Sequence, residues 1–230
     1  MILGIDTSTD TMSIALYQEG TILGEYTTNL KKNHSVRLLP AIQTLLEECG
    51  ATPRDLTKIA VSEGPGSYTG LRIGVTAAKT LAWDLDIPLV GISSLEVLAA
   101  SGRYFNGKIV PLMDARRGNV YAGVYETAAS GLASVHADQH ISLEELLAYL
   151  EEKKQPVLFI GQLSAAFREQ IIAALGERAT LSEPPYAYAR AGTLTWLAEQ
   201  KAGVPVHTFV PTYLKLAEAE SKWLEARKES

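Results

Sequence analysis

A glycine-rich turn between an apolar segment and a helical segment constrains the fold of this chain most strongly. The apolar run 58–62 leads into the turn 64–70, which reads GPGSYTG, and helical periodicity then continues to about residue 84. Glycine and proline permit a sharp strand-to-helix turn and a close approach of backbones. A buried strand that feeds such a turn and helix predicts an α/β fold with helices packed on a sheet.

The residues around this turn predict a mixed sheet. Segments 2–5, 12–16 and 21–28 are apolar or alternating, as expected for three short antiparallel strands. A helical segment follows at 35–49, and another strand is expected at 87–92. Three antiparallel strands followed by alternating helix and strand favour a single mixed sheet with helices on it.

The second half of the chain has a weaker pattern. We place a boundary after residue 103, with a first lobe at 1–103 and a smaller second lobe at 104–230. A C-terminal helix of the second lobe is expected to pack back on the first. The expected elements are a hairpin at 109–113 and 120–125, a strand at 157–160, and helices at 142–150, 165–175, 191–200 and from 216 onward.

Composition excludes several classes of protein. Of the 230 residues, 47% are hydrophobic and 20% charged, which indicates a packed core rather than disorder. The net charge of -5 does not suit a protein that holds RNA unaided. Cys49 is the only cysteine, so an internal disulfide is excluded. Because no stretch approaches the ~18 apolar residues of a membrane span, we expect a cytoplasmic protein.

Candidate catalytic and metal-binding residues are few. His136 and His140 would share one face of a helix, but they precede a capping Ser142 in a segment that looks extended. In a strand, residues four apart lie about 13 Å apart, too far to share one ion. Cys49 lies at a helix end, where a thiolate is disfavoured, and no Gly-x-Ser-x-Gly motif is present. We therefore expect no catalytic residue and no metal site.

Three segments resemble one family. Residues 5–9, IDTST, resemble the phosphate-loop hairpin of the actin, Hsp70 and sugar-kinase superfamily. The run 64–75 with Ala77-Ala78-Lys79, and the later segment 211–215, PTYLK, resemble the patterns of the TsaB (YeaZ) family. The resemblance covers nearly the whole chain. It implies an actin/Hsp70/sugar-kinase-like (ASKHA) fold: a mixed sheet flanked by helices, with a truncated second lobe.

The resemblance also implies a function. TsaB proteins are non-catalytic scaffold subunits that pair with the catalytic subunit TsaD and are joined by the ATPase TsaE. Together they transfer a threonylcarbamoyl group to the adenosine beside the anticodon in tRNAs that read codons beginning with A. We expect no cofactor to be bound autonomously, and the interface of the assembled complex is the place where ATP or ADP could bind. The family implies contact with tRNA only through the complex, and a homodimer as an alternative state of the isolated chain.

The helix that carries the metal ligands in the catalytic subunit TsaD can be compared with the matching segment of this chain. TsaD carries a His-x-x-x-His metal pair on the helix after the strand matched by 88–92. By alignment, the two histidine positions fall on Ser94 and Leu98. Serine is a poor ligand for zinc or iron and leucine cannot be one. The sequence therefore favours a scaffold over two alternatives, a small-molecule kinase or ATPase of the sugar-kinase superfamily and, less favoured, a metallopeptidase.

The glycine-rich turn has two interpretations. Backbone N–H groups at a helix N-terminus can bind phosphate, or the glycines serve only close packing. A Walker loop would end in Gly-Lys-Ser/Thr, whereas this turn continues Gly70-Leu71-Arg72. Related ATPases use the first hairpin around phosphate. The residues expected nearest to a nucleotide are Asp6, Gly64, Gly66 and Ser67.

Two helices of the first lobe are expected to form the contact with TsaD. The helix 35–49 is apolar on more than one side, which calls for burial on more than one side. The helix 70–84 presents small residues that permit close approach, although the same stripe suits packing on the chain's own sheet. The predicted interface consists of Val36, Leu39, Ile42, Leu46, Gly70, Leu71, Gly74, Ala77 and Ala78.

Overall fold

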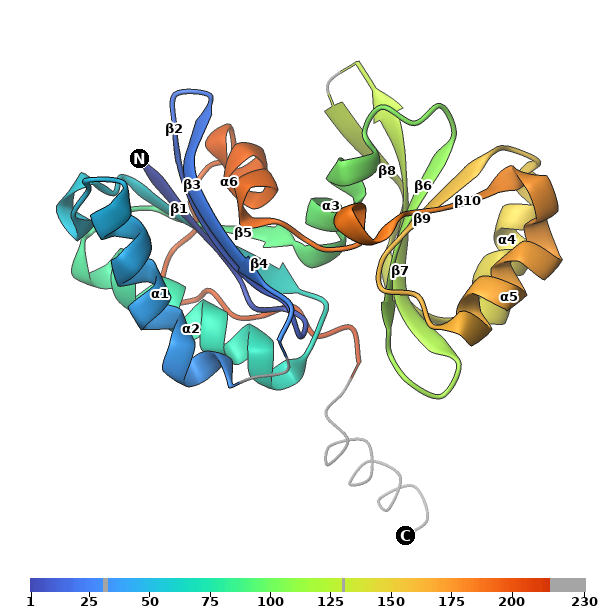
Figure 1. The fold of residues 1–230 in the computed structure, drawn as a ribbon, viewed down its shortest axis with the longest axis horizontal. Helices are drawn as coiled ribbons and strands as arrows, with labels where there is room; N and C mark the ends of the chain where they lie inside the picture. Colours follow the sequence, from blue (N-terminus) through green and yellow to red (C-terminus); the bar gives the residue numbers. More distant parts are fainter. Residues whose placement is uncertain (31–32, 130, 216–230) are drawn as a thin grey trace, which may run out of the picture.

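The protein consists of two lobes that lie side by side, each built on a five-stranded sheet (Figure 1). The computed structural model describes residues 1–30, 33–129 and 131–215, so the helix expected from residue 216 lies outside the described residues. Helices cover both sheets, and the predicted mixed sheet flanked by helices is confirmed. Within the described residues, no helix is both long enough and apolar enough to cross a membrane.

The first lobe begins with an antiparallel meander and continues with two parallel strands. Its sheet order is β3-β2-β1-β4-β5, with β4 and β5 parallel to β1. The elements are β1 (Ile2–Asp6), β2 (Met12–Gln18), β3 (Thr21–Thr28), α1 (His34–Glu48), β4 (Lys58–Gly64), α2 (Tyr68–Asp84) and β5 (Leu89–Ser93). Side chains at the helix starts act as N-caps: Asn33 accepts from the amide of Ser35, and Ser67 accepts from that of Gly70.

The second lobe repeats this topology. Its sheet order is β8-β7-β6-β9-β10, again a meander followed by two parallel strands. The elements are β6 (Lys108–Asp114), β7 (Asn119–Ala128), β8 (Gly131–Ser142), α4 (Leu143–Lys153), β9 (Val157–Ile160), α5 (Ala165–Leu175) and β10 (Ala179–Leu181). The weak sequence pattern conceals this repeat, because β10 has only three residues and β8 is half-exposed along its length.

Two helices connect the lobes. Helix α3 (Ser94–Ala99) follows β5 and lies between the sheets, in contact with β4 and β5 of the first and with β6 and β7 of the second. Helix α6 (Ala191–Glu199) follows the second lobe but packs against β1 and β2 of the first. The expected boundary after residue 103 thus falls between α3 and β6, while residues from 191 onward return to the first lobe (Figure 1).

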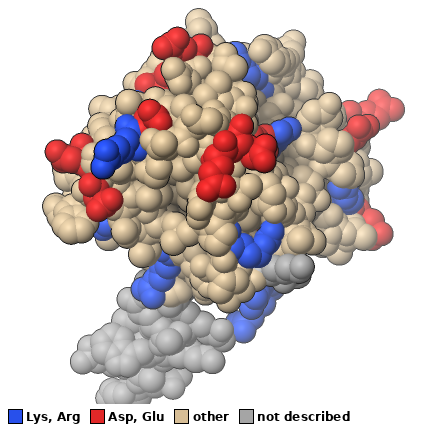
Figure 2. Space-filling model, turned by 60° about the vertical axis from the view of Figure 1, so that its left-hand side comes forward, with Lys and Arg blue, Asp and Glu red and all other residues tan. Residues whose placement is uncertain are grey.

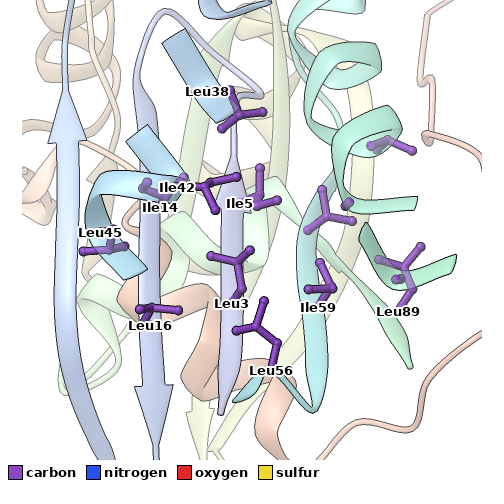
Figure 3. Packing of buried hydrophobic residues seen from close by; sticks show 14 of the residues in the cluster. Leu3, Ile5, Ile14, Leu16, Leu38, Ile42, Leu45, Leu56, Ile59 and Leu89 are labelled. Carbon is purple, nitrogen blue, oxygen red and sulfur yellow. The ribbon is translucent and has the colours of Figure 1, made fainter. Parts of the chain in front are cut away.

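The core of the first lobe lies between the sheet and helices α1 and α2. Leu3 and Ile5 of β1 meet Leu38, Ile42 and neighbouring side chains of α1, as Figure 3 shows. Residues 203–215, here called the C-terminal strap, follow α6 along the outer edge of β5. Their first anchor is Val204, whose amide donates to the carbonyl oxygen of Leu89 at 2.8 Å. The strap therefore covers an edge that would otherwise be open.

Candidate functional site

A cleft of about 650 Å³ lies between the lobes. The first lobe supplies the β1–β2 hairpin and the glycine-rich turn, and the second supplies the β6–β7 hairpin and the end of β9. Residues 8–10, 65–69, 112–116, 161–162, 187–189 and 212–215, with Leu98 and Tyr121, line the cleft. Its volume is in the range that holds small ligands.

Asp6 lies beneath the hairpin and does not line the cleft. Its Oδ1 atom accepts hydrogen bonds from the amide and hydroxyl of Ser8, at 2.9 and 2.8 Å. Its Oδ2 atom accepts from the hydroxyl of Ser62 at 2.6 Å. The side chain is buried, so these donors from its own chain compensate for its desolvation. The carboxylate fixes the ends of β1 and β4 relative to each other.

The turn after β4 contributes Gly66 and Ser67 to the cleft, but not Gly64. The amide of Ser67 already donates to the carbonyl oxygen of Ser8 at 2.7 Å. Gly64 has a φ of +124°, and an ideal Cβ there would lie 2.3 Å from the carbonyl oxygen of Thr212. Glycine at this position therefore makes room for the C-terminal strap. Of the residues expected near a nucleotide, only two reach the cleft.

The glycines of the turn and of α2 serve close packing on the first hairpin. An ideal Cβ on Gly66 or Gly70 would lie 2.2 or 2.1 Å from the carbonyl oxygen of Ser8 or Thr7, respectively. One on Gly74 would lie 2.4 Å from the hydroxyl of Thr7, which itself donates to the carbonyl oxygen of Gly70 at 2.7 Å. The prediction that this stripe contacts a partner is wrong, because Gly70, Leu71, Gly74 and Ala78 are buried inside the lobe.

Only part of the interface predicted on α1 is exposed. Ile42 and Leu46 belong to the core, so their assignment to a partner surface is also wrong. Val36 and Leu39 face outward with 68% and 56% of their surface exposed. On α2, Ala77 is half-buried against the core. Of the predicted interface residues, only Val36 and Leu39 are therefore exposed; on α2, Trp83 adds apolar surface that is 65% exposed.

The two segments that carry the TsaB resemblance contact each other. The amide of Thr212 in the strap donates to the carbonyl oxygen of Glu63 at 2.7 Å. The Nζ atom of Lys79 donates to the strap carbonyls of Phe209 and His207, at 2.6 and 3.3 Å. Lys79 therefore fixes the strap on α2. Sequence reasoning missed this contact, because the segments lie over 100 residues apart and the strap has no periodicity.

An aromatic pair completes the contact between the two segments. The rings of Tyr68 and Tyr213 lie 4.8 Å apart between centroids. The guanidinium of Arg72 lies 4.2 Å from the centre of the Tyr68 ring, and its Nε donates to the hydroxyl of Tyr213 at 3.3 Å. This hydrogen bond raises the pKa of Arg72.

A carboxylate from the second lobe also connects the two lobes. Asp138 of β8 accepts hydrogen bonds from the hydroxyl of Ser93, the N-cap of α3, and from that of Tyr125. Burial, followed by the charge of Asp138, raises the pKa of Tyr125. Because Ser93 ends β5, this bridge fixes the start of the helix that crosses between the lobes.

The positions aligned with the TsaD histidines lie on one side of α3. Leu98 lines the cleft, and Ser94, one turn earlier, is fully buried with no hydrogen-bond partner for its hydroxyl. No cluster of three His, Cys, Asp or Glu side chains suited to a metal occurs in the part of the chain that the structure describes.

The second histidine pair lies in a strand. His136 and His140 belong to β8, as the extended reading predicted, and their rings contact Tyr149 and Tyr121, respectively. Burial, followed by the nearby charge of Lys215, lowers the pKa of His140. Packing against tyrosine rings is therefore a sufficient role for His136 and His140.

Comparison with known proteins gives consistent results. The model of the family "TsaD: tRNA N6-adenosine threonylcarbamoyltransferase" matches residues 21–223. The chain is 50% identical to the tRNA threonylcarbamoyladenosine biosynthesis protein TsaB of Bacillus subtilis, over 99% of both proteins. It is 35% identical to the protein of the same name from Escherichia coli, over 57% of each.

Two solved structures from Pseudomonas aeruginosa share the fold. An uncharacterized protein with similarity to peptidase YEAZ matches with a TM-score of 0.77 and 26% identity, covering 93% of this chain and 99% of that one. A structure named YeaZ matches with a TM-score of 0.73 and 23% identity, with the same coverage. The arrangement of both lobes is thus shared along nearly the whole length.

Proposed function

This chain belongs to the TsaB (YeaZ) family of tRNA threonylcarbamoyladenosine biosynthesis proteins, and we propose that it is the non-catalytic scaffold subunit of the complex that makes this modification. In this proposal the chain pairs with TsaD, TsaE joins the pair, and tRNA is the substrate of the assembly. The complex transfers a threonylcarbamoyl group to the adenosine beside the anticodon of tRNAs that read codons beginning with A.

The observation that carries the non-catalytic role is the cleft side of α3. Leu98 occupies the cleft wall and the buried Ser94 lies one turn earlier, at the two positions where the resemblance places metal-binding histidines. Neither side chain is a ligand that would hold zinc or iron. A transferase that needs a metal pair on this helix would have neither of its ligands here.

A second observation supports the role in assembly. Val36 and Leu39 expose apolar surface on consecutive turns of α1, a helix that contacts α2. Exposed aliphatic side chains on neighbouring turns of a helix suit packing against a helix of a partner. We place the TsaD contact on this face. A second copy of the chain could occupy it when TsaD is absent, which would give a homodimer.

The proposal also concerns where a nucleotide binds. We propose that the isolated chain binds no cofactor and that ATP or ADP lies at the interface of the assembled complex. The amide of Ser67 and the carboxylate of Asp6 are engaged within the chain, which supports this assignment. A small-molecule kinase is the alternative that the 650 Å³ cleft favours, and it predicts that ATP binds to the purified chain in the cleft.

Reconstituted transfer tests the proposal. TsaD, TsaE, tRNA and the small substrates are combined with and without this chain, and threonylcarbamoyladenosine is quantified after digestion of the tRNA. We expect product only with the chain present, and none from the chain alone. Undiminished product without it would refute the scaffold role. Calorimetry with ATP and the chain alone separates the alternative, because micromolar binding would favour the kinase.

A further inference from the structure

Four exposed basic residues lie at the cleft or next to residues that line it; Arg116 and Lys215 line it themselves. They are Arg72 of α2, Lys215 of the strap, and Arg116 and Arg117 at the tip of the β6–β7 hairpin. Contacts connect them: Arg72 reaches the hydroxyl of Tyr213 in the strap, and Lys215 donates to the carbonyl oxygen of Ala115, next to Arg116, at 3.3 Å. We call Arg72, Lys215, Arg116 and Arg117 the basic rim.

The side chains of the basic rim form no ion pair within the described chain, although the carboxylate of Asp114 lies at the base of the same hairpin and accepts a hydrogen bond from the amide of Arg116 at 2.7 Å. Other basic residues of the molecule do have such partners: Lys108 pairs with Glu126 and Lys201 with Glu96. In Figure 2 the lower edge of the molecule shows basic and no acidic residues. The chain has a net charge of -5, so these cations stand against its overall charge.

The backbone of the hairpin tip does not itself favour the two arginines that it carries. Arg116, Arg117 and Gly118 have φ values of 69°, 54° and 76°, all in the left-handed region. A non-glycine residue there costs of the order of 1 kcal/mol, and glycine or asparagine would relax it. The turn is closed by the amide of Asn119 donating to the carbonyl oxygen of Arg116 at 3.1 Å. Nothing in this turn requires a guanidinium.

Aromatic faces accompany the cations. The guanidinium of Arg72 is held over the Tyr68 ring, which also contacts Tyr213. Tyr121 and Tyr188 line the cleft beside the rim, and the Tyr121 ring packs against His140. Cations that lie close together can meet the phosphates of a strand, and the ring of Tyr188 offers an aromatic surface to an unpaired base. An acidic protein segment would use the cations alone, so a cleft tyrosine beside them favours RNA.

We propose that the basic rim contacts the phosphate backbone of the tRNA in the assembled complex. This inference rests on the proposed function, which makes tRNA the substrate of the assembly. It goes further, because the scaffold then contributes phosphate contacts of its own. Four cations on one edge are too few for the isolated chain to hold RNA against its net negative charge, so the contact matters only when TsaD binds the same molecule.

The test measures binding of fluorescently labelled tRNA by the complex of this chain with TsaD. The variant Arg116→Asn/Arg117→Asn removes both charges and suits the left-handed backbone. At about 0.15 M salt, the loss of two phosphate contacts should weaken binding roughly tenfold or more, and the slope of log K against log salt should fall by about two. The variant Arg116→Lys/Arg117→Lys keeps the charges and should retain most of the affinity.

A matched control comes from the far side of the second lobe. Lys153→Asn/Lys154→Asn removes two exposed charges at the end of α4, where Lys154 also has a left-handed φ of 52°. This variant should bind tRNA as the unmodified complex does. Circular dichroism and the affinity for TsaD, measured for every variant, ensure that a loss reflects the tRNA contact and not the fold.

Three results would overturn the inference. One is unchanged tRNA affinity and salt slope for the asparagine variant in an intact complex. The second is an equal loss in the lysine-retaining variant, and the third is weakened binding of TsaD or TsaE in place of tRNA, which would assign the rim to a protein partner. The scaffold role is judged separately by omitting the chain from the transfer reaction, so either proposal can fail while the other stands.

Discussion

The two lobes share one strand order but present different surfaces. In the second lobe, the outward positions of α4 are mainly Glu144, Glu145, Glu151, Glu152 and Lys153, as expected of a helix that faces water. In the first lobe, the corresponding helix α1 exposes Val36 and Leu39. The exposed positions of α4 are thus mainly charged, whereas α1 adds two exposed aliphatic side chains to its polar positions Gln43, Thr44, Glu47 and Glu48. This difference is the reason for placing the proposed partner contact on α1.

The second helices of the two lobes differ as well. Helix α2 lies so close to the first hairpin that Gly70 and Gly74 leave no room for a Cβ. Helix α5 packs through larger side chains, Phe167, Ile171 and Leu175, which hold it away from its sheet. The strap adds a further asymmetry, because it follows β5 in the first lobe while β10 ends the second sheet. The glycine-rich turn and the start of α2 thus have small residues because the first lobe packs so closely there.

The largest expected effect comes from breaking that close packing. In Gly70→Val, the new side chain would meet the carbonyl oxygen of Thr7, a backbone atom that cannot move without displacing the hairpin. We expect a loss of about 3 kcal/mol or more in the free energy of unfolding, measured by urea denaturation. The neighbouring Thr69→Val, at an exposed position, should change it by less than about 0.5 kcal/mol. Equal stability of the two variants would contradict the packing role of the glycines and favour a phosphate-binding role instead.

The next largest effect concerns the exposed aliphatic residues of α1 and α5. Leu39→Asp should weaken binding to TsaD by about 2 kcal/mol, roughly thirtyfold, because a charge would replace apolar contact at the centre of the proposed interface. Ile172→Asp is the matched control: it alters an aliphatic residue of α5 with 46% of its surface exposed. Calorimetric titration measures both. Similar affinities for the two variants would remove α1 from the contact.

The sequence was sufficient for most elements of the first lobe but not for the inward face of α1. Two stripes with helical spacing compete there, one through Val36 and Leu39, and one through His34 and Leu38. A polar histidine argues against the second stripe, yet it is the buried one. The ring of His34 contributes a hydrogen bond with the carbonyl oxygen of Thr9 at 2.9 Å. Periodicity could not reveal that acceptor, because it comes from a distant hairpin.

The candidate site was predictable only in part for a related reason. The turn 64–70 was located correctly, since glycine and proline mark it locally. The sequence could not show whether its glycines bind phosphate or permit close packing. That depends on Thr7 and Ser8, which the fold of the sheet brings next to the turn. The strap is still less predictable, because its contacts with Lys79 involve backbone carbonyls that carry no sequence information.

A smaller effect should follow from releasing the strap, the feature that the second lobe lacks. Lys79→Met removes hydrogen bonds to the carbonyls of Phe209 and His207, which we expect to cost about 1–2 kcal/mol locally. Hydrogen exchange should then accelerate in residues 204–212 and not in α6. In Lys58→Met the pattern should reverse, because that ammonium donates to carbonyls at the end of α6. Identical exchange in both variants would contradict separate anchoring.

The smallest predicted effect depends on pH and concerns Glu63, whose carboxylate lies over Gly91 beside the ring of Phe209 in the strap. Burial raises the pKa of Glu63; Lys201 opposes the shift, and Glu96 and Asp138 add to it. A carboxyl group with a raised folded-state pKa contributes stability below its unfolded pKa, and this contribution is lost as pH rises through the folded pKa. Glu63→Gln should therefore be more stable than the unmodified protein at neutral pH, with a gain that shrinks toward pH 4.

The comparison of the two glutamine variants is decisive, because other carboxylates also titrate in this range. Glu48→Gln removes an exposed carboxylate of α1 and serves as the control for the change in net charge. Thermal denaturation between pH 4 and 7 measures both differences. Since the strap buries Glu63, combining Glu63→Gln with Lys79→Met should reduce the gain at neutral pH. An undiminished gain in the combined variant would show that the sheet, and not the strap, desolvates this carboxylate.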